Sequence, residues 1–517
     1  MAAAAALVQR GCRPAILDSG LSPDPMALSL KTKLAASEPE EWNSHDLDLV
    51  RRVGPAAANG IPRKLYFGSD FSFREIDPLD ELRVSKASIH RSFAAGGFSN
   101  VWGAVFQPLP AEEMKGWPVT CEELAPHYAA VRKLLCDATD ASNVRQSGES
   151  CPPASKLRPS SQAERLYADL QSNRQKLDRA GVSFDYAQLA VRSADNNGSK
   201  GCCYCGLCLH GCPYDCKYAA GRTLEKFVRA GAVEYIPGVA VDKLAPEDGN
   251  IRIEARSLSN GAPQSFLASR VFLAAGLLET SRTILNSLGI YDTPFQIKHS
   301  DIFTLPIVRY RAEPGISREK LHTLCQLVAQ IDDRAICPHP VHLQFYGYND
   351  LYPMIMRQKL GLLAYPLAPV LRAMATRLFV IFGYLHSSVS STISIALTNR
   401  QKPTLQLTGH PSAQAHKICR AVARKLLRMR KYFQAVPVEF QLRLDLPGGG
   451  YHSGGIFPMR RRPEAFETDR LGRLASLANV HIVDTSVLPE IPPFPPAFTA
   501  MANAHRIASA IEVPHDR

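Results

Sequence analysis

The chain has 517 residues, of which 45% are hydrophobic and 21% charged, with 60 Lys and Arg against 48 Asp and Glu and a formal net charge of +12. This composition is typical of a folded globular protein and excludes a disordered chain, a collagen and a simple coiled coil. The length exceeds that of a single core of about 250–300 residues, so we expect two domains that are interleaved in sequence.

The excess of positive charge favours anionic partners such as nucleic acid, lipid headgroups or an acidic redox protein. Its densest run, Arg420 to Lys431, has the spacing of the solvent-facing side of a helix, with Leu426 and Leu427 turned inward. Because no nucleic-acid motif accompanies this run, we expect no nucleic-acid partner. A basic protein that binds nucleic acid or a membrane surface stays as one alternative.

The first residues predict a helix over Ala2–Gln9 that stops at Gly11, followed by a short strand over Arg13–Leu17 that ends at Asp18. Helix, glycine, strand and acid form the second half of a Rossmann unit, in which the carboxylate accepts hydrogen bonds from the adenosine ribose. The G-x-G-x-x-G turn that normally precedes this helix and holds the pyrophosphate is missing from the sequence. We therefore expect a chain that is truncated or whose start codon is placed too late.

A glycine-rich turn follows at residues 94–104. Glycines beside small polar residues suit a backbone that closely approaches a flat cofactor while side chains supply hydrogen bonds. The residues of this turn that we expect at a cofactor are Gly96, Gly97, Ser99, Asn100 and Trp102.

Six of the 13 cysteines fall in a loop at residues 201–217. Cys202, Cys205, Cys208 and Cys212, followed by Pro213, have the spacing of the bacterial ferredoxin run. Thiolates suit an iron–sulfur cluster or zinc, and a loop of reduced or disulfide-linked cysteines without metal is the remaining alternative. The local clustering is not that of a secreted disulfide framework.

A second strand, turn and helix are expected at Val271–Ser281, where the apolar run VFL leads into Ala274, Ala275 and Gly276. Further on, Leu360–Leu385 is apolar, but prolines and arginines interrupt it, so it predicts a buried or surface-lying amphipathic segment and not a membrane span. No cleavable signal is expected at the first residues. These features predict a cytoplasmic protein with contact to a membrane surface as an open alternative.

The last elements are a strand that ends at Asp484, a proline-rich turn and a helix that begins near Phe498 and Thr499. The N-terminus of that helix would present backbone dipoles to an electron-rich ring.

Together these segments resemble the glucose–methanol–choline (GMC) family of FAD-dependent oxidoreductases over nearly the whole chain. The resemblance implies an α/β Rossmann-type FAD-binding domain, lacking its first strand, with an α+β substrate domain on an antiparallel sheet. It places the discontinuous FAD domain at 1–299, the substrate domain at 300–445 and a return to the FAD domain at 446–517. It also implies that Val241 meets the adenine and that Asp484, Thr485 and Thr499 lie at the flavin.

The family's catalytic histidine lies in a segment like H-x-x-G-T-x-x-M, which His452–Met459 resembles with Gly455 in place of the threonine. Oxidation of an alcohol by hydride transfer to flavin N5 also removes the hydroxyl proton, and an imidazole titrates in the range suited to a general base. A second family residue, Asn or His, corresponds to Pro495 here, or to Pro496 if the alignment shifts by one residue. A proline side chain cannot take part in proton transfer, so two-residue oxidase chemistry is not expected.

The cysteine loop, read as Cys203, Cys208 and Cys212, also resembles the cluster loop of bacterial FAD-dependent glucose dehydrogenases. That resemblance implies an iron–sulfur cluster that passes electrons to a quinone or cytochrome, hence a dehydrogenase acting on an alcohol, sugar or sterol-like CH–OH group. A catalytically decayed electron-transfer or assembly protein of the same fold is the alternative.

Overall fold

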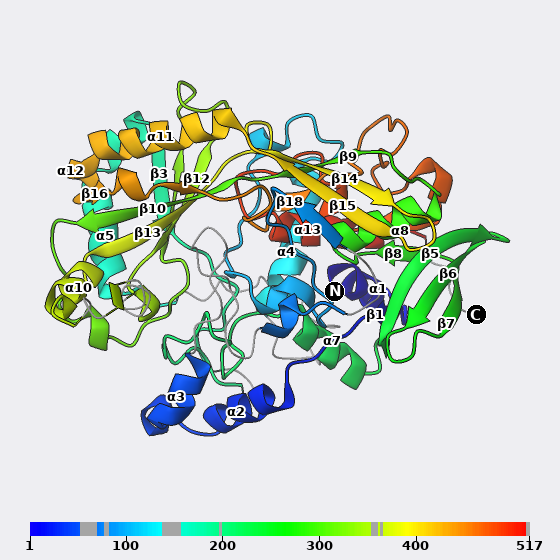
Figure 1. Ribbon diagram of the computed structural model, residues 1–517, viewed down its shortest axis with the longest axis horizontal. Coiled ribbons are helices and arrows are strands. Elements are labelled where there is room, and N and C mark those ends of the chain that lie inside the picture. Colours follow the sequence, from blue (N-terminus) through cyan, green and yellow to red (C-terminus); the bar gives the residue numbers. More distant parts are fainter. Residues whose placement is uncertain are drawn as a thin grey trace.

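The computed structural model describes residues 1–51, 70–76, 82–136, 157–195, 199–352, 360–361 and 365–512. It is an α/β structure with antiparallel and mixed sheets, in which one large antiparallel sheet lies beside a region of short parallel strands (Figure 1). Each part has its own cluster of buried apolar side chains. The prediction of an α/β chain with an antiparallel sheet is therefore confirmed at this level.

The antiparallel sheet has seven strands in the order β16-β10-β13-β12-β11-β3, with β17 also paired to β10. Side chains of β10 alternate between the buried core and the opposite face, the pattern of a sheet covered on one side. Helix α11 (Ala413–Arg428) contributes Ile418, Val422 and Leu426 to the core of this sheet. The strands are β3 (Val182–Tyr186), β10 (Ile302–Arg309), β11 (Leu327–Ile331), β12 (Val341–Tyr346), β13 (Leu378–Tyr384), β16 (Ala435–Pro437) and β17 (Arg443–Leu444); α5 (Ser161–Ser172), α6 (Arg174–Arg179) and α12 (Arg430–Phe433) are the neighbouring helices.

A five-stranded mixed sheet lies between this sheet and the parallel strands (Figure 1). Its order is β18-β9-β14-β15-β2, with only the last pair parallel. Ile393, Ile395 and Leu405 of this sheet belong to the core of the parallel region, although they lie within residues 300–445. The predicted division into domains stays a prediction. The strands are β2 (Leu82–Ser85), β9 (Phe295–His299), β14 (Thr392–Thr398), β15 (Thr404–His410) and β18 (Ser453–Gly454).

The parallel region contains two separate pairs of strands. Strand β1 (Ala15–Asp18) pairs with β4 (Glu234–Pro237), and β8 (Val271–Leu273) pairs with β19 (Val480–Ile482). A three-stranded antiparallel sheet flanks them, made of β5 (Val239–Glu247), β6 (Asn250–Ser257) and β7 (Pro263–Ala268). The neighbouring helices are α1 (Ala2–Gln9), α7 (Ala220–Arg229) and α8 (Leu277–Ser287). The predicted helix at 2–9 is confirmed, as are the strands that end at Asp18 and before Ala274.

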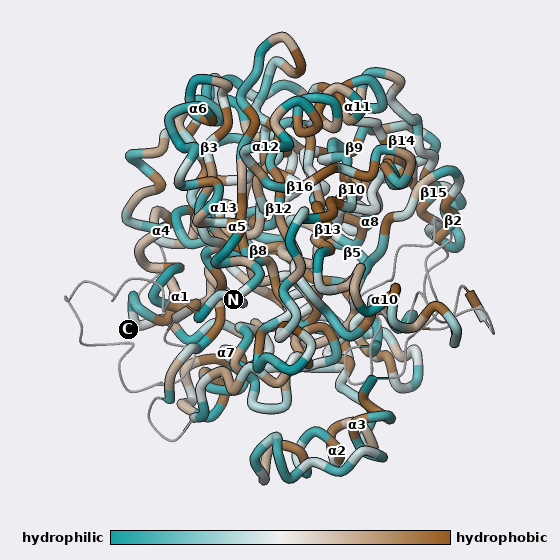
Figure 2. Tube along the Cα trace, turned by 90° about the vertical axis from the view of Figure 1, so that its left-hand side faces the viewer, coloured by the Kyte–Doolittle hydropathy of each residue, from teal (hydrophilic) through white to brown (hydrophobic). Residues whose placement is uncertain are grey.

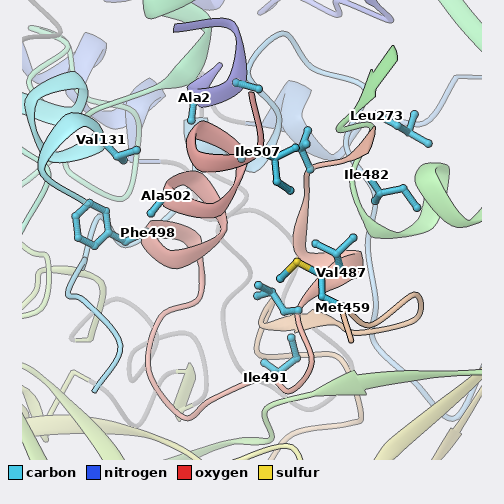
Figure 3. Packing of buried hydrophobic residues seen from close by; sticks show 14 of the residues in the cluster. Ala2, Val131, Leu273, Met459, Ile482, Val487, Ile491, Phe498, Ala502 and Ile507 are labelled. Atoms are coloured by element: carbon cyan, nitrogen blue, oxygen red, sulfur yellow. The ribbon is translucent and has the colours of Figure 1, made fainter. Parts of the chain in front are cut away.

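Helix α13 (Ala497–Ala510) packs against α1 and α4 (Cys121–Cys136) in the centre of the larger core. Figure 3 shows Phe498 and Ala502 on the side of α13 that faces Val131, and Ile507 on the opposite side of this helix. The ring of Phe498 contacts those of Phe106 and Tyr128 at centroid distances of 5.1 and 4.8 Å. The predicted helix near Phe498 is therefore confirmed, and it ties the two ends of the described chain together.

Helices α2 (Pro25–Ala35) and α3 (Ser44–Val50) stand at one edge of the molecule (Figure 2) and share a small apolar cluster with Leu207. Helix α10 (Ala368–Ala375) exposes Val370 and Met374, as an amphipathic surface segment would; residues 362–364 of the apolar run lie outside the described residues. Within the described ranges, every helix is too short or too polar to cross a lipid bilayer.

Candidate functional site

A cleft of about 1200 Å³ runs through the parallel region. It is lined by the ends of β1 and β8, the glycine-rich turn, the first turn of α1 and the segment around Tyr451. Pockets for single small molecules occupy about 300–1,000 Å³, so this cleft has room for an extended ligand such as a dinucleotide. Seven of the predicted cofactor residues line it: Asp18, Gly96, Gly97, Val241, Ala275, Gly276 and Thr485.

Asp18 ends strand β1 and is one of the residues that line the cleft. Burial raises the pKa of Asp18, while a hydrogen bond from the Tyr235 hydroxyl, 3.1 Å from Oδ2, acts in the opposite direction. An acceptor at the end of a parallel strand is the arrangement that binds the hydroxyl groups of a ribose.

The glycine-rich turn closes against the start of α7. Gly96 has φ +82°, and a Cβ on it would overlap the backbone nitrogen of Gly221. Ser99 is held by this contact, since its Oγ accepts a hydrogen bond of 2.8 Å from the N–H of Ala220. Asn100 donates to the carbonyls of Ala95 and Gly97 at 3.0 and 2.8 Å. Ser99 and Asn100 therefore stabilise the turn and do not themselves line the cleft.

At the opposite wall, Asp484 fixes the turn between β8 and α8. Its Oδ2 accepts hydrogen bonds from the N–H of Gly276 at 3.1 Å and from the hydroxyl of Thr280 at 2.6 Å. Burial raises the pKa of this carboxyl, and the same hydrogen bonds oppose the rise. Gly276 has φ +83° and is the N-cap of α8. Asp484 thus shapes the cleft from behind the lining residues.

Thr499, which the resemblance places at the flavin, is not among the residues that line the cleft. It is 2% exposed inside the helical core, and its hydroxyl is 2.8 Å from the hydroxyl of Tyr128. Trp102 also lies behind the lining, where its Nε1 donates to the carbonyl of Tyr218 at 2.8 Å.

His452 lies where the cleft meets the antiparallel sheet. Its two neighbours, Tyr451 and Ser453, line the cleft, and its own ring stacks on Tyr384 of β13 at 4.7 Å between centroids. Its carbonyl accepts a hydrogen bond of 2.9 Å from Ser300, which precedes β10. This loop therefore joins the cleft to the sheet that was predicted to bind substrate.

A second imidazole, His342 of β12, was not recognised in the sequence. It lies opposite Tyr384 in the β12–β13 register, 6.2 Å away between ring centroids, and 5.3 Å from Phe494. Burial lowers the pKa of His342 to about 3, so its ring is neutral at pH 7. His452 and His342 thus flank one tyrosine ring. The alternation of apolar and polar residues along the strand indicates which face His342 occupies, but only strand pairing brings it to Tyr384, the ring on which His452 stacks.

An ion cluster behind the cleft was also missed. Glu279 of α8 binds Arg91 at 2.9 Å and Arg282 at 2.8 Å, and all three side chains are less than 10% exposed. Arg282 also donates to the carbonyl of Val241 at 2.8 Å, which fixes the strand predicted to meet an adenine. The i, i+3 spacing of Glu279 and Arg282 on one helix was the feature of the sequence that could have indicated this ion pair.

The cysteine loop packs directly behind the glycine-rich turn, since Lys217 Nζ donates to the carbonyl of Trp102 at 3.2 Å. Its thiols are free, and in the described part of the chain no three of its sulfurs lie within 4.8 Å of one another. A hydrogen bond with Cys216 lowers the pKa of Cys212 to about 6, and burial raises that of Cys202 to about 12. The predicted ligands Cys202, Cys203, Cys205, Cys208 and Cys212 share one loop, and their occupancy by metal stays a prediction.

The cleft fits the FAD that the family resemblance implies. It has the volume for a dinucleotide, an acid at the end of a parallel strand, and two glycine turns on opposite walls. The first turn of α1 lines the cleft, where the positive end of a helix dipole favours a phosphate group.

Comparison with solved structures finds a fold similar to that of pyridoxine 4-oxidase from Mesorbium loti, with a TM-score of 0.58 at 15% sequence identity. The match covers 98% of this chain and 95% of the oxidase chain. No protein-family model matches the sequence, and no curated protein matches it. The shared property is therefore the fold.

Proposed function

We propose that this chain is an FAD-dependent dehydrogenase of the GMC type that oxidises a CH–OH group. The observation that carries this proposal is one cleft that unites Asp18, Gly96, Gly276 and Thr485 and ends beside His452. The fold shared with pyridoxine 4-oxidase, by name an oxidase, supports the same class of reaction.

Different residues of the lining would bind different parts of the cofactor. Asp18 would bind the ribose, Val241 the adenine, and the backbones at Gly96, Gly97 and Gly276 the remainder. FAD, when bound, accepts the hydride from the carbinol carbon. Arg282 and Asp484 would act indirectly: Arg282 holds the backbone of Val241 in place, and Asp484 holds that of Gly276.

His452 would take the hydroxyl proton of the substrate. Its Nδ1 is buried, and Nε2 is the atom that we propose to meet the hydroxyl. Neutral His342 is the partner we propose in place of the family's second residue, because Pro495 has no side chain suited to proton transfer and His342 lies beside Phe494. A neutral imidazole can accept or donate one hydrogen bond and so orient the hydroxyl.

The electron acceptor is a further part of the proposal. The cysteine loop contacts Trp102 of the glycine-rich turn, so a cluster bound there would lie behind this wall of the cleft. Such a cluster transfers electrons singly to a quinone or cytochrome. Exposed apolar residues on α10 would suit contact of a cytoplasmic enzyme with a membrane surface. Iron and sulfide analysis of the purified chain tests the cluster directly.

The test of the activity is reduction of a redox dye with a panel of alcohols, sugars and sterols by the flavin-loaded protein. His452→Ala should reduce kcat at least about 100-fold, the usual contribution of a general base. The matched control is His416→Ala, a histidine exposed on α11, which should leave kcat unchanged. Full turnover by His452→Ala would contradict the assignment of His452 while leaving the fold intact.

One observation favours the alternative of an electron-transfer or assembly protein that lacks catalysis. The position corresponding to the family's second catalytic residue is Pro495, buried in the turn before α13. Flavin absorbance without turnover of any substrate in the panel would support this alternative. Absence of flavin absorbance would contradict both functions.

A further inference from the structure

A second group of polar residues, separate from the cleft, meets at one end of the β12–β13 strand pair. The strands are antiparallel with His342 opposite Tyr384, so the residues just before β12 and just after β13 meet at one end. His339 and His386 occupy these positions, and their rings stack at 3.6 Å with 9° between the planes. Glu113, from the short helix η4 (Ala111–Met114), lies against both rings.

A potential ligand atom of each of the three side chains lies within 4.8 Å of those of the other two. Within the described ranges, no other group of three His, Cys, Asp or Glu side chains meets this criterion. Glu113 Oε1 is 3.4 Å from Nδ1 of His339, and Oε2 is 4.0 Å from Nε2 of His386. Glu113 and His386 are buried, whereas the side chain of His339 is 30% exposed.

The buried carboxylate needs a positive partner. Glu113 is 7% exposed, and its Oε2 has no hydrogen-bond partner in the structure. Removing a carboxylate from water without compensation costs several kcal/mol, so such an oxygen is normally paired or bound to a cation. At Nε2, His386 faces this oxygen at a distance too long for a hydrogen bond.

We propose that Glu113, His339 and His386 bind one divalent transition-metal cation of the Zn²⁺ class. Two imidazoles and one carboxylate are a donor set that suits such a cation and leaves further coordination positions for water. The exposed side of His339 provides the entry path. Because stacked rings cannot both direct a lone pair at one ion, binding requires the partly exposed His339 ring to turn out of the stack while Nδ1 stays near Glu113.

Ser388 holds the ring of His386 at Nδ1, the ring atom opposite the one that faces Glu113. Its backbone N–H donates to Nδ1 at 3.1 Å, and its Oγ lies 2.9 Å from the same atom. With a cation at Nε2, the proton of the neutral ring lies on Nδ1 and is donated to Oγ of Ser388, in place of the bond from the backbone N–H; metal-bound histidines commonly donate their second ring N–H in this way. This site is independent of the proposed oxidoreductase activity, since none of its three residues lines the cleft.

The experiment is Zn²⁺ binding by the full chain, measured by equilibrium dialysis and by the absorbance of bound Co²⁺. The wild type should bind one equivalent that Glu113→Gln and His386→Ala lose, with Kd weakened by about 100-fold or more. Glu112→Gln changes the exposed neighbour on the same short helix and should retain that equivalent. Binding by the loop cysteines is separated from this site, because it survives Glu113→Gln and gives Co²⁺ a thiolate charge-transfer band.

Folding is checked by thermal unfolding of each variant without metal. His339→Asn alters the most exposed ligand and serves if a variant at a buried position fails to fold. Equal Zn²⁺ stoichiometry and affinity in the wild type, Glu113→Gln and His339→Asn would overturn the proposal. Loss of the equivalent in Glu112→Gln as well would overturn it too.

Discussion

Replacing Gly96 by alanine tests how the glycine-rich turn forms the wall of the cleft. Gly96 has φ +82°, and an added Cβ would overlap the nitrogen of Gly221 and lie 3.1 Å from its Cα. Both atoms belong to the backbone at the start of α7, which cannot rotate away as a flexible side chain would. The turn and the helix must therefore separate to admit one methyl group.

The magnitude follows from two contributions. A non-glycine residue in the left-handed region costs roughly 1–2 kcal/mol, and overpacking against a fixed neighbour adds about 1–3 kcal/mol. Gly96→Ala should therefore lower the free energy of unfolding by roughly 2–5 kcal/mol, measured by urea denaturation with circular dichroism. Flavin content of the purified variant should fall as well, because the turn lines the cleft.

The adjacent glycine is a matched control. Gly97 has φ +56°, and a Cβ there would have no atom within 4 Å, so Gly97→Ala has only the backbone cost of about 1–2 kcal/mol. Equal losses of stability in the two variants would refute the argument from close approach. Normal stability in Gly96→Ala would refute the position assigned to α7.

Three further predictions concern stability. Phe498→Ala should destabilise the chain by about 3–5 kcal/mol, since it empties a fully buried ring position between α13 and α4, and calorimetry measures this. Glu279→Gln should cost up to about 3–5 kcal/mol in urea denaturation because two buried guanidinium groups each lose one carboxylate partner, while Arg91 keeps Glu75 and Arg282 keeps Asp242. Glu467→Gln, in a partly exposed pair, should cost less than about 1 kcal/mol. Burial lowers the pKa of His342 to about 3 and that of His322 to about 4. Between pH 6.5 and about 4 the unfolded chain therefore binds more protons than the folded chain, and the free energy of unfolding falls as the pH falls. The decrease is up to about 1.4 kcal/mol per pH unit for each histidine. Urea midpoints across that range that stay constant would contradict the last prediction.

Elements defined by adjacent residues were predictable from sequence. The alanine run of α1, the stop at Gly11 and the apolar residues of β8 act locally, and the structure forms each element where expected. Gly96 and Gly276 were also recognisable, because their positive φ values are needed within a few residues of a turn.

Features that depend on distant pairing were not predictable. His342 meets Tyr384 only through the β12–β13 register, and the buried Glu279 finds Arg91 188 residues away. Thr499 shows the converse: its helix was predicted, but the packing of α13 on α4 turns its hydroxyl to Tyr128. Sequence spacing does not report such contacts, since they arise from tertiary packing.

The contact of α1 with α13 has a consequence for how the molecule is made. Arg10 donates hydrogen bonds to the carbonyls of Ala508 and Ile511, which are 498 and 501 residues away in the sequence. A growing polypeptide therefore emerges from the ribosome with one face of α1 bare until synthesis reaches residue 511. Contacts of such long range slow folding and leave apolar surface open to aggregation, so chaperone supply and low expression temperature should govern the yield of native protein.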